Sequence, residues 1–388
     1  MLEAILAGLS ALSEGVRFLS TQGGPNLVML GIAAVMFYLA VAKGVEPLLL
    51  LPIAFGCMLV NLPLSEVMSH EGVLRTFYDM GIGNELFPLL IFVGIGSMTD
   101  FSPLLANPRL LLFGAAGQLG IFLTLILALA LGFSRESAVA VAAIGACDGP
   151  TVIYVSNLFA GLGKIPEAMV GSLAVAAYSY MALVPIIQPP IMRLLTTKKE
   201  RQTPMPPVAG RVSPTALMVF PIVVTVITGI IAPKGLPLMG MIMLGNFVKV
   251  TGVAGRLAKA SENEIANIAT LFLGLAIGGT MLGTDFLRKE TMLVFALGLV
   301  AIVIDTVGGL LLGKLWYLLS GGKINPLIGA AGISAYPMAA RLVQNEGQRW
   351  DKQNFLLMHA MAANTGGQIG SVMAAAIMLS VLKGLGVI

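Results

Sequence analysis

The stretch that decides the fold is AVAVAAIGACDGPTVIYVSNL, residues 138–158. Apolar residues fill both of its ends, and the motif GACDGPT (145–151) interrupts the middle. Proline lacks a backbone N–H and clashes with the preceding helical turn, so the motif predicts a helix that breaks at Gly149-Pro150. An acidic residue such as Asp148 at a break inside an apolar segment is typical of an ion pathway in a membrane protein.

The composition supports a membrane protein, because 57% of the 388 residues are hydrophobic and only 11% are charged. A soluble protein of this size needs more charge to cover its surface. Several stretches approach or exceed the roughly 20 apolar residues that cross a bilayer. They are Pro25–Ala42, Leu110–Leu131, Met169–Met192, Thr215–Ala232, Met292–Leu312 and Met358–Leu382. We therefore predict an all-α polytopic membrane protein with about 10–11 membrane segments.

Matching landmarks in the two halves predict an internal repeat. The matched pairs are Pro52–Asn61 with Pro237–Asn246 (246 − 61 = 185), Asp100-Phe101 with Asp285-Phe286 (285 − 100 = 185), and GACDGP with GISAYP (337 − 150 = 187). Each match is weak alone, but chance does not readily preserve their order and spacing. Two repeats of inverted topology, each with a broken or re-entrant segment, are the pattern of secondary transporters, whose halves meet around a midplane site.

The chain divides into four predicted parts. Residues 1–24 place Leu2, Ile5 and Leu9 at helical spacing among charged residues, which predicts an N-terminal interfacial helix. The first membrane repeat then covers 25–194, a linker 195–213, and the second repeat 214–388. The basic residues that cluster near the linker are Arg193, Lys198, Lys199, Arg201 and Arg211. By the positive-inside rule this linker is cytoplasmic, in a multi-pass protein of the inner (plasma) membrane.

Two broken segments carry the candidate ligands. In the first, Asp148 and freed backbone carbonyls offer the oxygen donors that Na⁺ prefers. The alternative is that Asp148 only caps the second half-helix. The second segment, NPLIGAAGISAYP (325–337), supplies the neutral donors of Asn325 and Ser334, and Arg341 follows it. Arg341 reads equally well as a snorkelling residue at a helix end.

Other polar residues within apolar segments have structural alternatives. Tyr178 and Tyr180 fit an interfacial aromatic belt. Asp305 and Gln118 occupy matching places (305 − 118 = 187) and favour buried hydrogen bonds between helices. The glycine-rich ANTGGQIGS (363–371) favours close packing first and ion coordination second. With no phosphate-binding loop and a net charge of only +4, neither nucleotide hydrolysis nor nucleic-acid binding is indicated.

Five longer motifs resemble one known family. They are GIGSMTDFSPLLANP, GACDGPT, AYSYMALVPIIQPPIMRLLTTKKER, NPLIGAAGISAYPMAAR and NFLLMHAMAANTGGQIGS. In length and order they are similar to the β subunit of the sodium-translocating, biotin-dependent decarboxylases that act on oxaloacetate, methylmalonyl-CoA or glutaconyl-CoA. Cys147 and Tyr336 depart from the family pattern, but neither departure removes a proposed ligand. The length of the chain favours an acyl-CoA substrate for the whole complex.

The resemblance implies a function and a set of partners. Carboxybiotin, carried on a separate carrier subunit, is decarboxylated with uptake of a proton, and Na⁺ is exported. The implied partners are a carboxyltransferase α subunit, the biotin carrier and a small single-span membrane subunit, with a homo-oligomer expected. The chain itself would be the carboxybiotin decarboxylase.

The resemblance also implies roles for individual residues. Asp148 becomes the central Na⁺ and proton site, with Asn325, Gly329 and Ser334 as further metal ligands. Arg341 and Tyr180 become catalytic residues that contact carboxybiotin. The alternative function is a Na⁺-coupled secondary transporter of a small carboxylate, which shares the repeat but performs no chemistry. A structural scaffold fits less well, because it needs no acidic residue in a broken span.

Overall fold

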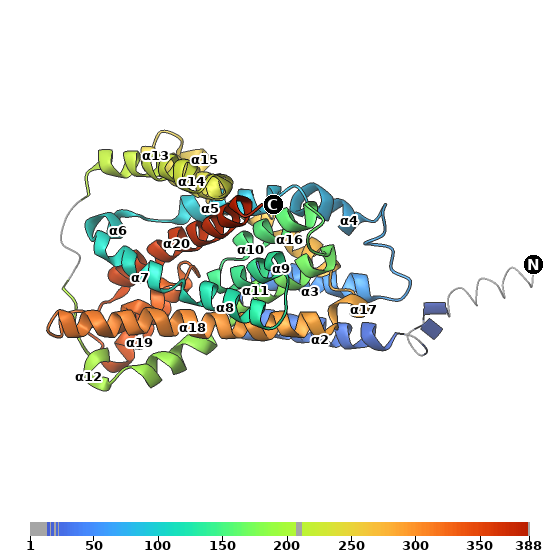
Figure 1. The fold of residues 1–388 in the computed structure, drawn as a ribbon, viewed down its shortest axis with the longest axis horizontal. Helices are drawn as coiled ribbons and strands as arrows, with labels where there is room; N and C mark the ends of the chain where they lie inside the picture. The colour runs from blue at the N-terminus through green and yellow to red at the C-terminus, as the bar shows by residue number, and fades with distance from the viewer. Residues whose placement is uncertain (1–13, 16, 19–20, 22, 207–211, 387–388) are drawn as a thin grey trace, which may run out of the picture.

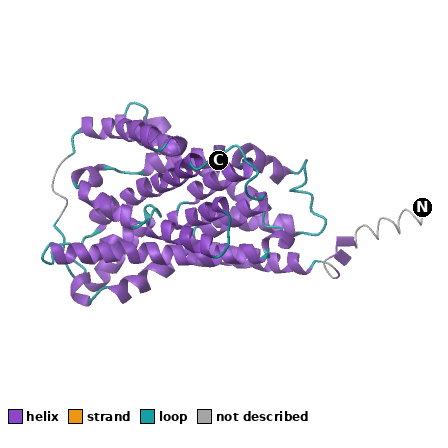
Figure 2. Cartoon of the chain, viewed as in Figure 1, coloured by secondary structure: helices purple, strands orange, loops and turns teal. Residues whose placement is uncertain are grey.

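The computed structural model describes the whole chain except residues 1–13, 16, 19–20, 22, 207–211 and 387–388. The predicted interfacial helix 1–24 therefore lies almost entirely outside the described residues, as does part of the linker. Within the described ranges every regular element is a helix and no strand occurs (Figure 2). The prediction of an all-α protein is confirmed.

The first half of the chain forms a series of helices, interrupted by one π-helical and two 3-10 stretches. The elements are α2 (Gly24–Lys43), α3 (Pro47–Asn61), α4 (Val73–Phe77), η1 (Tyr78–Ile82), α5 (Leu86–Met98), α6 (Ser102–Ala106), η2 (Pro108–Leu110), α7 (Leu111–Ala116), α8 (Leu119–Ala130), α9 (Arg135–Ala142), η3 (Ala143–Ala146), α10 (Gly149–Gly161) and α11 (Glu167–Leu195).

The second half begins with a short helix in the linker. It contains two of the three longest helices that the structure describes. The elements are α12 (Lys198–Arg201), α13 (Pro214–Ile231), η4 (Pro233–Gly235), α14 (Leu236–Thr251), α15 (Gly255–Ala260), η5 (Ser261–Ile265), α16 (Ala266–Gly279), α17 (Gly283–Phe286), α18 (Lys289–Leu319), η6 (Pro326–Gly332), α19 (Met338–Trp350) and α20 (Leu357–Gly384).

The described helices make the chain a polytopic membrane protein. Five helices are long and apolar enough to cross a bilayer, and two bent pairs raise that number to seven. The predicted 10–11 segments exceed this number. The difference arises where the chain uses shorter apolar helices, such as the 15-residue α3, which do not cross a bilayer by length alone. The larger number stays a prediction.

Proline accounts for the sharpest bend of α11. Its parts Met169–Met181 and Leu183–Leu195 meet at 55°, and Pro185 lies just after the bend. A proline ring clashes with the carbonyl four residues earlier, here that of Met181, and bends the helix at that point. Two further prolines, Pro189 and Pro190, follow within the same helix.

Reciprocal hydrogen bonds join the two halves at the asparagines that ended the first pair of sequence landmarks. Asn61 donates from Nδ2 to the carbonyl of Met281 (2.7 Å) and accepts the N–H of Gly283 (2.9 Å). Asn246 donates to the carbonyl of Thr99 at 2.9 Å. Asn246 therefore binds the start of Thr99-Asp100-Phe101, and Asn61 binds the residues just before Thr284-Asp285-Phe286. Such exchange is what two related halves would produce, and the repeat itself stays a prediction.

Two long helices run side by side and in the same direction. Near their starts, the hydroxyls of Ser172 on α11 and Thr291 on α18 lie 3.2 Å apart. Near their ends, Lys314 Nζ donates to the carbonyl of Leu195 at 3.0 Å. Figure 1 shows α18 along one side of the molecule, α13 to α15 as a separate layer on the other, and α20 between them.

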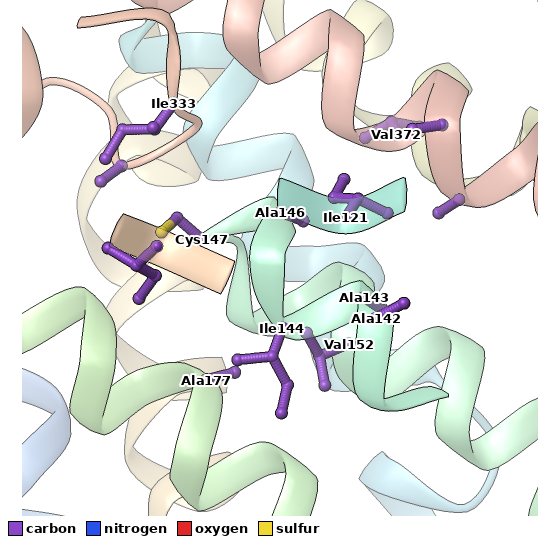
Figure 3. Packing of buried hydrophobic residues seen from close by; sticks show 14 of the residues in the cluster. Ile121, Ala142, Ala143, Ile144, Ala146, Cys147, Val152, Ala177, Ile333 and Val372 are labelled. Atoms are coloured by element: carbon purple, nitrogen blue, oxygen red, sulfur yellow. The ribbon is translucent and has the colours of Figure 1, made fainter. Parts of the chain in front are cut away.

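The core around the first broken segment is built from small side chains. Residues 138–147 are almost completely buried, and most of them are alanine, valine or glycine. Figure 3 shows Cys147 and Ile144 of this segment between Ile121 of α8, Ala177 of α11 and Ile333, which follows η6. Small residues let helix backbones approach closely, which in a membrane replaces much of the hydrophobic driving force. The helix break is thereby held at the centre of the protein.

Candidate functional site: two helix breaks facing α20

Asp148 lies at the break that the sequence predicted. The 3-10 turn η3 ends at Cys147, whose φ of 50° is in the left-handed region, and Asp148 follows in an extended conformation at the N-cap position of α10. A left-handed backbone at a residue other than glycine is strained and often marks a functional site. The side chain of Asp148 is only 3% exposed.

Two side chains donate to the carboxylate of Asp148. The hydroxyl of Thr151, one turn into α10, lies 2.7 Å from Oδ2, and Nε2 of Gln368 on α20 lies 3.4 Å from the same oxygen. No ion pair to Asp148 occurs among the described residues. The carboxylate is therefore held by neutral donors, without a basic side chain to balance its charge.

Tyr178 of α11 lies against the break. Its ring packs so closely on Gly149 that a Cβ at this glycine would be 2.2 Å from the ring, so the contact requires glycine. The Tyr178 side chain is 5% exposed, its hydroxyl has no hydrogen-bond partner among the described residues, and it is within electrostatic range of Asp148. The predicted alternative of an interfacial belt is wrong, because Tyr178 and Tyr180 are both buried.

The two broken segments meet the same helix, α20. Asp148 contacts Gln368 from one side. From the other, Ser334 donates to the carbonyl of Gly367 at 2.8 Å, and the carbonyl of Ile333 accepts from Nδ2 of Asn364 at 2.6 Å. The motif ANTGGQIGS thus provides the surface on which the segments converge.

This region is rich in buried oxygen atoms that lack donors. Oδ1 of Asn364 and Oγ1 of Thr365, both on fully buried side chains, have no partner in the described part of the chain, and neither does the hydroxyl of Tyr178. Buried polar atoms are almost always satisfied in native proteins, so each such oxygen needs a reason. These oxygens and the Asp148 carboxylate are donors of the kind that suits a hard cation. The described residues contain no cluster of three His, Cys, Asp or Glu side chains that could bind a transition metal.

Two of the predicted metal ligands make contacts of a different kind. Nδ2 of Asn325 donates to the carbonyls of Arg201 and Thr203, and its Oδ1 caps the N–H of Leu327. Gly329 packs directly on α18, where a Cβ would lie 1.9 Å from the carbonyl oxygen of Gly309. Both residues are buried in the second broken segment, but their contacts attach it to the linker and to α18.

The two predicted carboxybiotin contacts lie on different parts of the protein. The hydroxyl of Tyr180 donates to the carbonyl of Phe295 on α18, and its ring is 7% exposed. Arg341 is exposed on the first turn of α19, within electrostatic range of Tyr336. Neither contacts Asp148 through any hydrogen bond or ion pair among the described residues, and their predicted roles stay predictions.

Gln118 and Asp305 make the buried inter-helix hydrogen bonds that were expected of them. Nε2 of Gln118 donates to the carbonyls of Gly332 and Gly367, at 3.2 and 3.3 Å. Oδ1 of Asp305, on α18, accepts the N–H of Gly120 at the start of α8, 2.5 Å away. Gln118 is the N-cap residue of α8, but its side chain does not cap the helix. Asp305 accepts one of the free N–H groups at this N-terminus in its place.

The linker is more structured than its composition indicated. Thr197 and Glu200 form a capping box around α12, and the guanidinium of Arg201 lies 4.2 Å from the ring centroid of Trp350. Arg193 pairs with Glu346 of α19 through two hydrogen bonds of 2.8 and 2.7 Å. Burial raises the pKa of Glu346, but the hydrogen bonds from Arg193 and Trp350 outweigh it and leave the pKa below its usual value.

Sequence reasoning missed part of the wall around Asp148. Thr151 and Tyr178 were not among the predicted ligands, and Asn364 and Gln368 were given packing roles first. A signal was present in ANTGGQIGS, because Asn364 and Gln368 are four residues apart and share one helix face. Which helix that face meets could not be read from the sequence.

The chain matches known proteins over nearly its whole length. The sequence model of a family described as the Na⁺-transporting oxaloacetate decarboxylase beta subunit matches residues 25–382. The chain is 45% identical to the glutaconyl-CoA decarboxylase subunit beta of Acidaminococcus fermentans, covering 99% of this chain and all of that one. It is 46% identical to the methylmalonyl-CoA decarboxylase subunit beta of Veillonella parvula, covering 98% of this chain and all of the relative. It is 40% identical to the oxaloacetate decarboxylase beta chain of Klebsiella pneumoniae, covering 96% and 99%.

Proposed function

This chain belongs to the family of Na⁺-transporting oxaloacetate decarboxylase β subunits, and on that premise we propose that Asp148 binds the transported Na⁺. Members of the family couple a decarboxylation to Na⁺ transport, and this chain is a membrane subunit of such a decarboxylase. The alternative of a secondary transporter without chemistry has no support from these matches. The observation that carries the Asp148 proposal is a buried carboxylate at a helix break that has no basic partner among the residues the structure describes.

The physical argument starts from the charge of Asp148. An ionised carboxylate in a membrane interior is costly unless a cation balances it. Since no basic side chain in the described part of the chain pairs with Asp148, the balancing cation is Na⁺ in one state and a proton in another. The unpartnered oxygens of Tyr178, Asn364 and Thr365 then complete the coordination of Na⁺. Ser334 belongs to the same site, since it bonds the residue just before Gln368.

The other predicted ligands act on the site through the backbone. Asn325 and Gly329 fix the second broken segment against the linker and α18, so that Ser334 and Ile333 reach α20. We infer that they position the segment and do not touch the ion. This inference replaces direct coordination by Asn325 and Gly329 with a contribution to the shape of the site.

The reaction that drives transport consumes a proton. In carboxybiotin the C–N bond to the ureido nitrogen breaks, CO₂ leaves, and a proton takes its place on nitrogen. Arg341 is exposed on the first turn of α19, so the guanidinium can receive the carboxylate of a carboxybiotin brought by another protein. Biotin is thus a cofactor carried by the complex, and Na⁺ is the cargo of this chain.

The names of the relatives identify them as subunits, and this chain is one subunit of a larger complex. We propose a carboxyltransferase α subunit, a biotin carrier and a small single-span membrane subunit as its partners, in an assembly with more than one copy of this chain. The linker 195–213 would face the cytoplasm from the plasma membrane, because basic residues collect there.

The substrate of the whole complex is proposed to be an acyl-CoA. The relatives that act on glutaconyl-CoA and methylmalonyl-CoA align over 383 and 382 residues, close to the 388 of this chain. The alignment to the Klebsiella oxaloacetate decarboxylase β chain needs 435 positions, more than this chain contains. The purified complex, given each acid in turn, tests the assignment: faster decarboxylation of oxaloacetate than of either CoA ester would reject it.

The experiment for the site compares two aspartates in the reconstituted complex. Asp148→Asn keeps the size and the hydrogen-bonding oxygen of the side chain but removes its charge, and we expect Na⁺-dependent decarboxylation of carboxybiotin to disappear. Asp79→Asn is the control, since Asp79 is exposed in an ion pair with Arg75. If Asp148→Asn retained full Na⁺-coupled turnover, the assignment of Asp148 would be wrong.

A further inference from the structure

One cavity outside the site described above lies at the starts of α11 and α18. Its volume is about 460 Å³, and its lining includes Ser172, Thr291, Val294, Asp285 and Glu290. Both helices belong to the candidate membrane spans, which begin at Met169 and Lys289. The cavity therefore opens where these two spans begin.

The cavity lies at the end of the protein opposite the linker. The helices α11 and α18 run in the same direction, paired at their starts by Ser172 and Thr291 and at their ends by Leu195 and Lys314. The linker follows directly after Leu195. If the linker faces the cytoplasm, as proposed above, the cavity faces the outside.

The lining of the cavity suits a cation. Asp285 is paired with Arg288, so the acidic side chain of Glu290 leaves the three charged lining residues with a net charge of −1 (−1 + 1 − 1). The hydroxyls of Ser172 and Thr291 are buried deeper, with Ser172 4% and Thr291 5% exposed. A polar recess with excess negative charge attracts cations, and its hydroxyls can replace water around Na⁺.

Tyr180 packs on α18 next to the cavity wall and close to the first broken segment. Val294 lines the cavity, and the next residue on α18, Phe295, accepts the hydroxyl of Tyr180 through its carbonyl. One turn further, a Cβ at Gly298 would lie 2.6 Å from the Tyr180 ring and 3.0 Å from Ile144. Ile144 is four residues before Asp148. Tyr180 thus packs on α18 beside Val294 of the cavity wall, at the glycine where Ile144 of the first broken segment also packs.

We propose that this cavity is the outer vestibule of the Na⁺ path, that Ser172 and Thr291 contact the ion there, and that Tyr180 closes it from the Asp148 site. The proposal rests on the proposed function and adds the route by which Na⁺ leaves. It gives Tyr180 the role of a barrier in place of a contact with carboxybiotin. Removing the Tyr180 ring would join the vestibule to the buried site.

The test uses cysteine labelling of the full decarboxylase complex in sealed vesicles of either orientation. The reagent is a membrane-impermeant, cationic methanethiosulfonate. Wild type is the blank, because its two cysteines, Cys57 and Cys147, are buried. We expect Ser172→Cys and Thr291→Cys each to be labelled only from the face opposite the linker. The fixed positive charge should then slow Na⁺ export about tenfold, as the field of a charged cleft does for ion entry.

Two controls define the faces and the depth. Ser320→Cys, at the linker end of α18, should react only from the linker face and leave transport unchanged. Thr306→Cys, buried in the middle of α18, should react from neither face. Labelling of Ser172→Cys and Thr291→Cys from the linker face, from neither face, or without any loss of transport would overturn the vestibule. Adding Asp148→Asn to either cysteine variant should remove the ion site but leave the labelling pattern unchanged. The labelling pattern therefore tests the vestibule separately from the ion site.

Discussion

The two broken segments have matching sequence patterns but different tasks. The first, 143–151, places the carboxylate of Asp148 at its break, and no basic side chain among the described residues pairs with it. The second, 325–337, carries only neutral polar groups at its break, and they bind backbone: Asn325 to the linker and Ser334 to α20. The first break therefore carries a charge, and the second attaches the segment that shapes the site to its neighbours. Mutations should therefore separate function from stability.

The largest expected effect is on function and comes from the first segment. Asp148→Asn should reduce Na⁺ affinity by more than about 100-fold, the upper end of what even outer ligands contribute to a metal site. Its thermal stability should not fall, because the change removes a buried charge without a partner. Radioactive Na⁺ binding and thermal unfolding in detergent measure the two quantities. A large loss of stability would mean that Asp148 is a structural residue.

The next effect is on stability and comes from the second segment. Asn325→Ala removes two buried hydrogen bonds and a helix cap, which should lower the free energy of unfolding by about 2–4 kcal/mol. The protein that remains folded should bind Na⁺ with an affinity within a few-fold of wild type. Ser102→Ala, at the first residue of α6, is the control, because the Ser102 contact with Asp100 is exposed and is made by its backbone N–H. If Asn325→Ala abolished Na⁺ binding at full stability, Asn325 would be a direct ligand.

Tyr178 and Tyr180, both on α11, should have different effects on Na⁺ binding and on Na⁺ flux. Tyr178→Phe removes a hydroxyl beside Asp148 and should weaken Na⁺ binding about tenfold. Tyr180→Ala removes the ring together with its bond to Phe295, and should leave the affinity unchanged while allowing Na⁺ to pass without decarboxylation. Na⁺ flux into vesicles that lack carboxybiotin distinguishes the two variants. Equal effects of both substitutions on affinity would contradict the separation of site and barrier.

The smallest effect concerns the linker contact between Arg193 and Glu346. The folded pKa of Glu346 lies below its usual value, so the pair stabilises the protein above the unfolded pKa and this stability is lost as pH falls through the folded pKa. Glu346→Gln should lower stability at pH 7 by about 1 kcal/mol, since Arg193 is partly exposed. The difference from wild type should shrink as pH falls below about 4.3, the usual Glu value, and vanish only at a pH below the folded pKa of Glu346. Thermal unfolding at both pH values checks the prediction, and an equal difference at both would disprove it.

The sequence predicted the class of the protein and the position of its central residue. Apolar length and scarce charge are sufficient for a membrane assignment, because the bilayer imposes them on every span. The break at Asp148 follows from local chemistry as well, since Gly149-Pro150 cannot continue a helix. The same local reasoning correctly gave Asp305 and Gln118 hydrogen bonds between helices.

Only the tertiary structure decided which polar groups share a site. Asn325 and Ser334 are nine positions apart on one segment, yet one faces the linker and the other faces α20. Tyr178 and Tyr180 differ by two positions, which on a helix turns them about 200° apart, toward Asp148 and toward α18. Spacing along the chain fixes such an angle but not the neighbour that it meets. That neighbour depends on how α11, α18 and α20 pack, and packing is a property of the whole fold.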